Sequence, residues 1–122
     1  MNIKDKIKKI IIKKPLKLDC GETIVEYPLA YETYGKLNEK KDNAILAFHA
    51  LTGDQFVTGI NPITNKNGWW SYLVGPDKPV DTNKFFVIAA NVIGGCMGSF
   101  GPSDINPKTK KQIKVLEQNF QL

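Results

Sequence analysis

Two early segments alternate between apolar and polar positions in the way that strands do. Segment 16–24 reads as a short strand, a turn at Gly21 and the start of a second strand, and segment 27–35 alternates with period two up to Gly35. We expect these two segments to form an antiparallel pair at the edge of a sheet. Pro28 lacks a backbone N–H donor, and an edge position tolerates that loss.

Two later segments are continuous apolar runs, 44–48 and 85–92. Such runs are typical of strands that are buried on both faces of a parallel sheet. Each run leads into a long loop rich in glycine, proline and asparagine, and ligands bind at such loops in open α/β sheets. The pattern predicts an α/β fold of partial extent, a sheet with few helices to cover it.

The two ends of the chain differ from its middle. In residues 1–15 Ile3, Ile7, Ile10 and Ile11 are spaced as on a helix between lysines. This pattern suits either an amphipathic helix on a membrane surface or a basic tail, and we expect the tail. The predicted organisation is therefore a basic N-terminal tail (1–15), a folded part (16–110) and a C-terminal tail (111–122).

The net charge of +5 arises from these ends. Lysines concentrate in 1–17 and 108–122, whereas segment 18–107 is net acidic, and all 17 basic residues are lysine. Arginine is the usual reader of phosphate and guanine, so we expect no nucleic-acid partner. No apolar run approaches the ~18 residues that a membrane span needs. We expect a cytoplasmic protein in which Cys20 and Cys96 are reduced thiols.

The end of the first apolar run carries the single histidine, His49. We expect it to anchor a loop by hydrogen bonds rather than to act as a catalytic base. The turn 49–54 that begins there could direct a backbone N–H at a developing oxyanion, although an ordinary strand-to-loop turn explains it equally. Asp54 and Asp104 are expected to accept hydrogen bonds from loop backbone.

The end of the second apolar run places a cysteine where a nucleophile elbow has its nucleophile, in Gly94-x-Cys96-x-Gly98. An elbow needs a helix after the turn, and Gly101 and Pro102 in the following segment are incompatible with one. The better interpretation is a glycine-rich pocket wall with a structural cysteine, made by Gly94, Gly95, Cys96 and Gly98. Ser71, Ser99 and Ser103 lie outside any G-x-S-x-G pattern, and no residue cluster has metal-ligand spacing.

Segments 29–38, 48–55, 68–76 and 85–107 resemble, in order and spacing, the homoserine O-acetyltransferase family and its relatives that use succinyl-CoA or serine. The resemblance covers about residues 16–110. It implies an α/β-hydrolase core and a Ser–His–Asp triad that carries an acyl group from acyl-CoA to L-homoserine in methionine biosynthesis, without a bound cofactor. A homodimer is the expectation for the full-length enzyme.

The resemblance also assigns roles to residues. It makes the backbone N–H of Leu51 an oxyanion donor, and it places the serine elbow and the catalytic Asp and His beyond this chain. Because the sequence after Lys110 does not resemble the family, we expect a fragment truncated before the elbow and inactive alone. Two alternatives remain open: one half of a split acyltransferase with a complementary C-terminal chain, and a non-catalytic binding module with basic tails.

Overall fold

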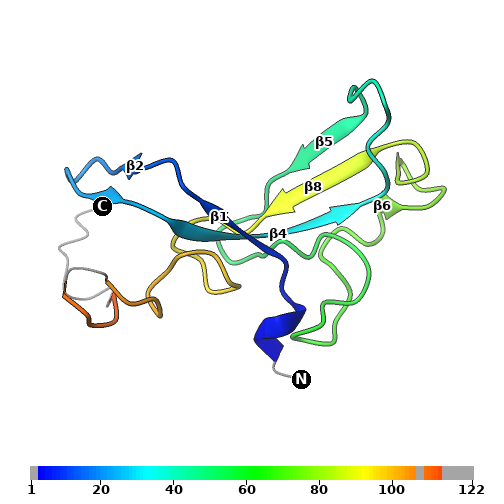
Figure 1. Cartoon of the computed structure of the whole chain (residues 1–122). Helices are drawn as coiled ribbons and strands as arrows, with labels where there is room; N and C mark the ends of the chain where they lie inside the picture. The colour runs from blue at the N-terminus through cyan, green and yellow to red at the C-terminus, as the bar shows by residue number, and fades with distance from the viewer. Residues whose placement is uncertain (1–2, 107–108, 114–122) are drawn as a thin grey trace.

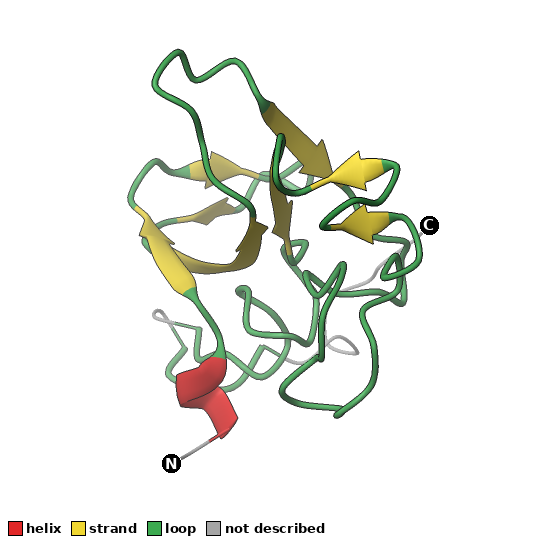
Figure 2. Cartoon of the chain, turned by 90° about the vertical axis from the view of Figure 1, so that its right-hand side faces the viewer, coloured by secondary structure: helices red, strands yellow, loops and turns green. Residues whose placement is uncertain are grey.

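The structure is a computed structural model, and it describes residues 3–106 and 109–113 (Figure 1). Strands and loops make up most of this part of the chain, and a short 3-10 helix lies near the N-terminus (red in Figure 2). The elements in chain order are η1 (Ile3–Lys6), β1 (Lys9–Ile12), β2 (Leu16–Lys17), β3 (Thr23–Ile24), β4 (Tyr27–Tyr34), β5 (Ala44–Ala47), β6 (Val74–Gly75), β7 (Val80–Asp81) and β8 (Phe86–Ala90).

The main sheet has four strands in the order β1-β4-β8-β5 (Figure 1). β4 runs antiparallel to both of its neighbours, whereas β5 and β8 are parallel and pair from Ala44↔Phe86 to Ala47↔Ala89. The two continuous apolar runs therefore form the parallel pair that the sequence predicts. The sheet as a whole is mixed, with its parallel part on one side.

The predicted pairing of segment 16–24 with segment 27–35 is wrong. β2 and β3 pair with each other across the predicted turn at Gly21, which has a φ of 88°. β4 pairs instead with β1 and β8 and lies inside the sheet. Pro28 is nevertheless accommodated there opposite Ile11, and its carbonyl accepts a hydrogen bond from the Phe100 N–H at 2.8 Å.

The expectation of a tail over residues 1–15 is also wrong for Lys9–Ile12, which forms β1. β-branched isoleucines favour a strand, and a ready partner exists in the first half of β4. Lys8 Nζ adds a salt bridge to Glu32 Oε2 at 3.1 Å. Of the predicted tail 111–122, residues 114–122 lie outside the described part. Gln112 pairs with Ile105 in an isolated bridge.

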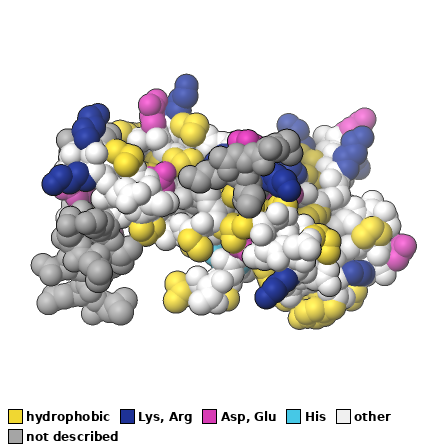
Figure 3. Space-filling view, turned by 90° about the horizontal axis from the view of Figure 1, so that it is seen from below, with side chains coloured by type: hydrophobic (Ala, Val, Ile, Leu, Met, Phe, Trp, Pro, Cys, Tyr) yellow, Lys and Arg dark blue, Asp and Glu magenta, His cyan; other side chains and the backbone are white. Residues whose placement is uncertain are grey.

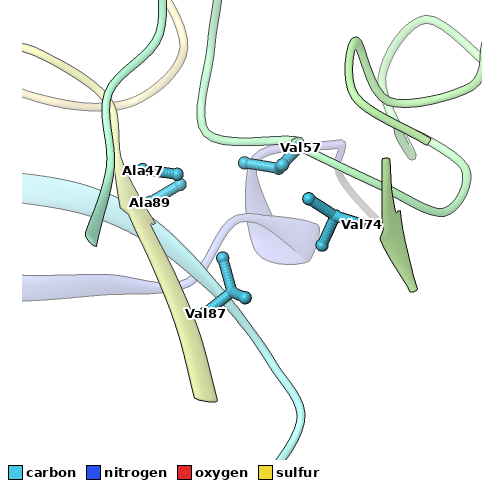
Figure 4. Close-up of a cluster of buried hydrophobic side chains, with 5 residues drawn as sticks. All are labelled: Ala47, Val57, Val74, Val87 and Ala89. Carbon is cyan, nitrogen blue, oxygen red and sulfur yellow. The ribbon is translucent and has the colours of Figure 1, made fainter. Parts of the chain in front are cut away.

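The core lies on one face of the sheet. Ala47, Val87 and Ala89 point from β5 and β8 toward Val57, in the loop after β5, and toward Val74 of β6 (Figure 4). Trp69 packs against this cluster, with its ring centroid 4.9 Å from that of Trp70. Loop residues and the short strand β6, rather than a helix, therefore cover this face.

The other face of β5 is open, because Leu46 is 58% exposed and Phe48 is 77% exposed. The prediction that this strand is buried on both faces is therefore wrong, since no α-helix occurs in the described residues to cover it. Hydrophobic side chains reach the surface in several places between lysines on the side shown in Figure 3. Within the described residues no helix is long and apolar enough to cross a membrane.

Candidate functional site

The loops that follow β5 and β8 leave the sheet side by side. Ala47 and Ala89 are register partners near the carboxyl ends of two parallel strands, so both chains emerge at the same edge. The loop after β5 covers residues 48–55 and is called the Leu51 loop below. The loop after β8 covers residues 91–101 and is called the glycine-rich loop. Together they form the candidate site.

His49 joins the two loops. Its Nε2 accepts a hydrogen bond from the Val92 N–H at 3.2 Å, and its Nδ1 lies 2.7 Å from the Ala50 carbonyl oxygen. The carbonyl is an acceptor, so the proton of a neutral ring sits on Nδ1 and leaves Nε2 as the acceptor. Both nitrogens are thereby engaged, which confirms that this histidine anchors a loop.

Two buried amide side chains hold the glycine-rich loop at Met97. Asn91 Oδ1 accepts a hydrogen bond from the Met97 N–H at 3.2 Å, and Gln55 Nε2 donates to the Met97 carbonyl at 3.0 Å. Sequence reasoning missed both residues, and no local pattern marks them, because Gln55 lies seven positions after the first apolar run and Asn91 lies inside the second. Gln55 Oε1 is buried without a hydrogen-bond partner among the described residues.

Ser99 is a structural residue. Its buried Oγ accepts a hydrogen bond from the Ala30 N–H at 2.9 Å and donates one to the Asn91 carbonyl at 2.5 Å. The hydroxyl therefore ties the glycine-rich loop to β4 and has its proton committed to a carbonyl. This geometry agrees with the prediction that Ser99 is no acyl-transfer nucleophile.

The predicted pocket wall is a tightly folded part of the glycine-rich loop. It contains Gly94, Gly95, Cys96 and Gly98. A Cβ on Gly95 would lie 2.7 Å from Asn91 Oδ1, and one on Gly101 would lie 2.5 Å from the Gly95 carbonyl oxygen. No helix follows within the described residues, as expected, and Cys96 is an exposed free thiol. That these residues wall a substrate pocket stays a prediction.

Leu51 lies at the exposed tip of its loop, where it is 95% accessible. Its backbone N–H has no acceptor among the described residues, while the Gly53 N–H closes a turn onto the Ala50 carbonyl at 2.8 Å. Near the end of the loop, Asp54 Oδ1 accepts a hydrogen bond from the Phe56 N–H at 2.8 Å. The loop thus presents an N–H donor without a partner among the described residues, on a turn held by hydrogen bonds. Asp54 accepts a hydrogen bond from loop backbone, as predicted, and so does Asp104, which accepts from the Gly101 N–H.

A cleft of about 250 Å³ is also present in the molecule. Glu32 and Tyr34 of β4 line it together with Phe56 and Thr58. The Tyr34 hydroxyl lies 3.5 Å from the Gln55 carbonyl oxygen, so the cleft lies beside the last residue of the Leu51 loop and not at the tip of that loop. Burial raises the pKa of Tyr34 to about 12, despite hydrogen bonds from loop backbone that act in the other direction.

No metal centre is evident in the part of the chain that the structure describes, where no group of three or more His, Cys, Asp or Glu side chains comes together. Cys20 and Cys96 are both free and exposed. The candidate site therefore consists of backbone donors, two amide side chains and one histidine.

Comparison with known sequences identifies curated relatives. The chain is 75% identical over 112 residues to a homoserine O-acetyltransferase of Pelagibacter ubique, covering 92% of the chain and 30% of that protein. It is 60% identical over 96 residues to one of Nitrobacter hamburgensis, covering 24% of that protein. The chain thus spans less than a third of these relatives, and the longer match extends past the predicted 16–110 segment. No protein-family model matches it.

Solved structures show the same arrangement of strands. A homoserine O-acetyltransferase from Bacillus anthracis superposes with a TM-score of 0.77 at 33% identity, over 88% of this chain and 30% of that one. Esterase E22 superposes with a TM-score of 0.74 at 28% identity, over 87% of this chain and 31% of that one. The sheet therefore corresponds to part of an α/β-hydrolase-like structure.

Proposed function

Because the chain carries a segment of the homoserine O-acetyltransferase family, we propose that it contributes the oxyanion-binding loop of an enzyme that transfers an acetyl group from acetyl-CoA to L-homoserine in the cytoplasm. The observation that carries this proposal is the free backbone N–H of Leu51 beside the glycine-rich loop. Acetyl-CoA is a co-substrate in this scheme, and no bound cofactor is required.

The Leu51 N–H suits the proposed role because it is exposed, unpaired within the described residues and held on a braced turn. When a nucleophile attacks a thioester, the carbonyl oxygen gains negative charge, and a preorganised N–H stabilises that charge. His49 maintains the geometry, since its two ring nitrogens fix both the turn and the neighbouring loop. The chain would thus stabilise the transition state without taking a proton.

The nucleophile of the proposed reaction comes from the remaining family sequence. Among the described residues Ser99 is buried and hydrogen-bonded at both sides, and both nitrogens of His49 are occupied. In the proposed scheme a serine hydroxyl attacks the thioester, CoA leaves as the thiol, and the homoserine hydroxyl then takes the acyl group and frees the serine. The chain alone is expected to be inactive.

The test uses the chain joined to the part of the Pelagibacter ubique enzyme that follows its matched segment. Leu51→Pro removes the N–H, whereas Leu51→Ala keeps it and trims only an exposed side chain. We expect kcat for acetyl transfer to fall by about 10²- to 10³-fold in the proline variant and to change little in the alanine variant.

Equal rates in both variants would contradict the role of the Leu51 N–H. An active fusion that prefers another acyl acceptor would contradict the substrate assignment and leave the oxyanion role standing. Turnover by the unfused chain above background would overturn the expectation that it is inactive alone.

A further inference from the structure

Asp54 ties the end of the Leu51 loop to the segment that follows it. Its Oδ1 accepts a hydrogen bond from the Phe56 N–H at 2.8 Å, and its Oδ2 accepts one from Asn61 Nδ2 at 3.0 Å. Its carbonyl oxygen accepts a third from Trp69 Nε1 at 3.0 Å. Hydrogen bonds to a carboxylate are stronger than those between neutral groups. Two side chains from distant positions of the long loop before β6 therefore converge on one residue, three positions after Leu51.

Asn61 is held in one orientation by its own turn. It is only 4% exposed, and its Oδ1 accepts hydrogen bonds from the Ile63 N–H at 2.8 Å and the Thr64 N–H at 3.2 Å. Its backbone N–H donates to the Lys66 carbonyl at 2.8 Å. Because two donors engage the amide oxygen, the amide nitrogen is the group that faces Asp54. The Asp54 carboxylate is thus bound to a donor whose orientation is fixed.

Leu51 lies between two such anchors. His49 provides the first, because its Nδ1 lies 2.7 Å from the Ala50 carbonyl oxygen. Asp54 provides the second, directly after Gly53, whose N–H donates to the same carbonyl at 2.8 Å. No acceptor among the described residues holds the Leu51 N–H itself, so the anchors on both sides set its direction. A misplacement of about 1 Å in a catalytic group can cost about 10²-fold in rate.

We propose that the hydrogen bond between Asp54 and Asn61 fixes the direction of the Leu51 N–H during acetyl transfer, which makes both of them positioning residues. This inference rests on the proposed function, since the direction matters only if the N–H meets a developing oxyanion. Neither side chain takes part in the chemistry, because both carboxylate oxygens of Asp54 and both polar atoms of the Asn61 amide are already hydrogen-bonded within the described fold.

The experiment exchanges the two side chains in the fusion with the Pelagibacter ubique segment. Asp54→Asn leaves two donors facing each other in either orientation of the new amide, and Asn61→Asp sets two carboxylates against each other. The double variant restores one donor and one acceptor and keeps the oxygens that accept from loop backbone. We expect each single change to lower kcat by about tenfold or more with little change in KM, and the double variant to return kcat to within about threefold of the parent.

A second measurement shows whether the pair acts through the Leu51 N–H. Leu51→Pro removes that donor, so Asp54→Asn added to it should lower the remaining kcat by less than about twofold. Asp42→Asn is the matched control, because Asn38 Nδ2 donates to Asp42 Oδ1 at 2.6 Å in the exposed loop between β4 and β5. We expect this control to keep the kcat of the parent.

An unchanged kcat in the single variants, no recovery in the double variant, a further loss in the Leu51→Pro background or an equal loss in Asp42→Asn would overturn the inference. If thermal melts show that Asp54→Asn does not fold, Asn61→Asp breaks the same contact from the other side. Unfolding of both would also overturn the inference, because the contact would then be required for folding. A parental rate for Leu51→Pro contradicts the proposed function and this inference together, whereas a slow Leu51→Pro beside a fully active Asp54→Asn contradicts this inference alone.

Discussion

The Nε2 atom of His49 accepts a hydrogen bond from the Val92 N–H at 3.2 Å, and this contact joins the ends of two parallel strands. The residues lie 43 positions apart, yet one imidazole ring spans the gap between their loops. Since Nδ1 binds the Ala50 carbonyl, the ring connects the turn before Leu51 to the start of the glycine-rich loop.

Replacement of His49 by alanine should therefore loosen both loops together. We expect the free energy of unfolding to fall by about 1–2 kcal/mol, because the Val92 N–H loses its acceptor. Amide exchange at Val92 should become faster. Phe48→Ala is the control, since this neighbour is largely exposed and its loss should change stability little. Unchanged exchange at Val92 in His49→Ala would show that the contact does not hold the loop.

Ser99→Ala should be destabilising in proportion to the buried groups that it leaves unpaired. Its hydroxyl accepts a hydrogen bond from the Ala30 N–H and donates one to the Asn91 carbonyl. We therefore expect the free energy of unfolding, measured by chemical denaturation, to fall by about 1–3 kcal/mol. Ser103 is exposed, and Ser103→Ala should shift the midpoint hardly at all. If the two alanine variants denature alike, Ser99 has no structural role of the kind described.

Gly101→Ala should disrupt the packing within the glycine-rich loop. The added Cβ would lie 2.5 Å from the Gly95 carbonyl oxygen, a backbone atom that has little freedom to move, so we expect a cost of about 1–3 kcal/mol. Gly21→Ala is the comparison, because its Cβ would meet open space and only the positive φ opposes it, at about 1 kcal/mol. Thermal melts followed by circular dichroism rank the two, and a smaller loss for Gly101→Ala would contradict the close approach.

Tyr34 should make stability depend on pH in the alkaline range. Its pKa rises from 10.0 to about 12 on folding, so the folded chain holds the phenol proton more tightly than the unfolded chain does. The resulting stabilisation is complete below about pH 10 and is lost as the pH rises through about 12. Tyr34→Phe should lose less stability than the parent between those values, as urea midpoints will show. Parallel decline in both proteins would refute the assignment.

The parallel pair was predictable because β5 and β8 are continuous apolar runs. Such a run can be recognised in the sequence however the loops between the two strands fold. The strand at Lys9–Ile12 could not be predicted from the sequence, because isoleucines among lysines fit a helix, a tail or a strand equally well. Only the partner in β4 decides among these, and a partner distant in sequence leaves no local signal.

The site shows the same division. The anchoring role of His49 followed from its place at a strand end, and the structural role of the loop acids from ordinary turn chemistry. Gln55 and Asn91 were missed because their function depends on the fold of residues 94–98, which brings Met97 between them. Neighbours that meet only after several turns of a loop cannot be inferred from spacing.

The position of β8 has a consequence for how the sheet assembles. β8 lies between β4 and β5 in space but comes after both in the chain, so it is the last of the four strands to leave the ribosome. Until it arrives, β1 and β4 can form only a hairpin-like pair, and β5 has no partner. Closing the long loops that separate β8 from its neighbours makes folding slow and exposes apolar strands in the meantime. A nascent chain should therefore depend on chaperones most strongly while residues 44–85 are being synthesised.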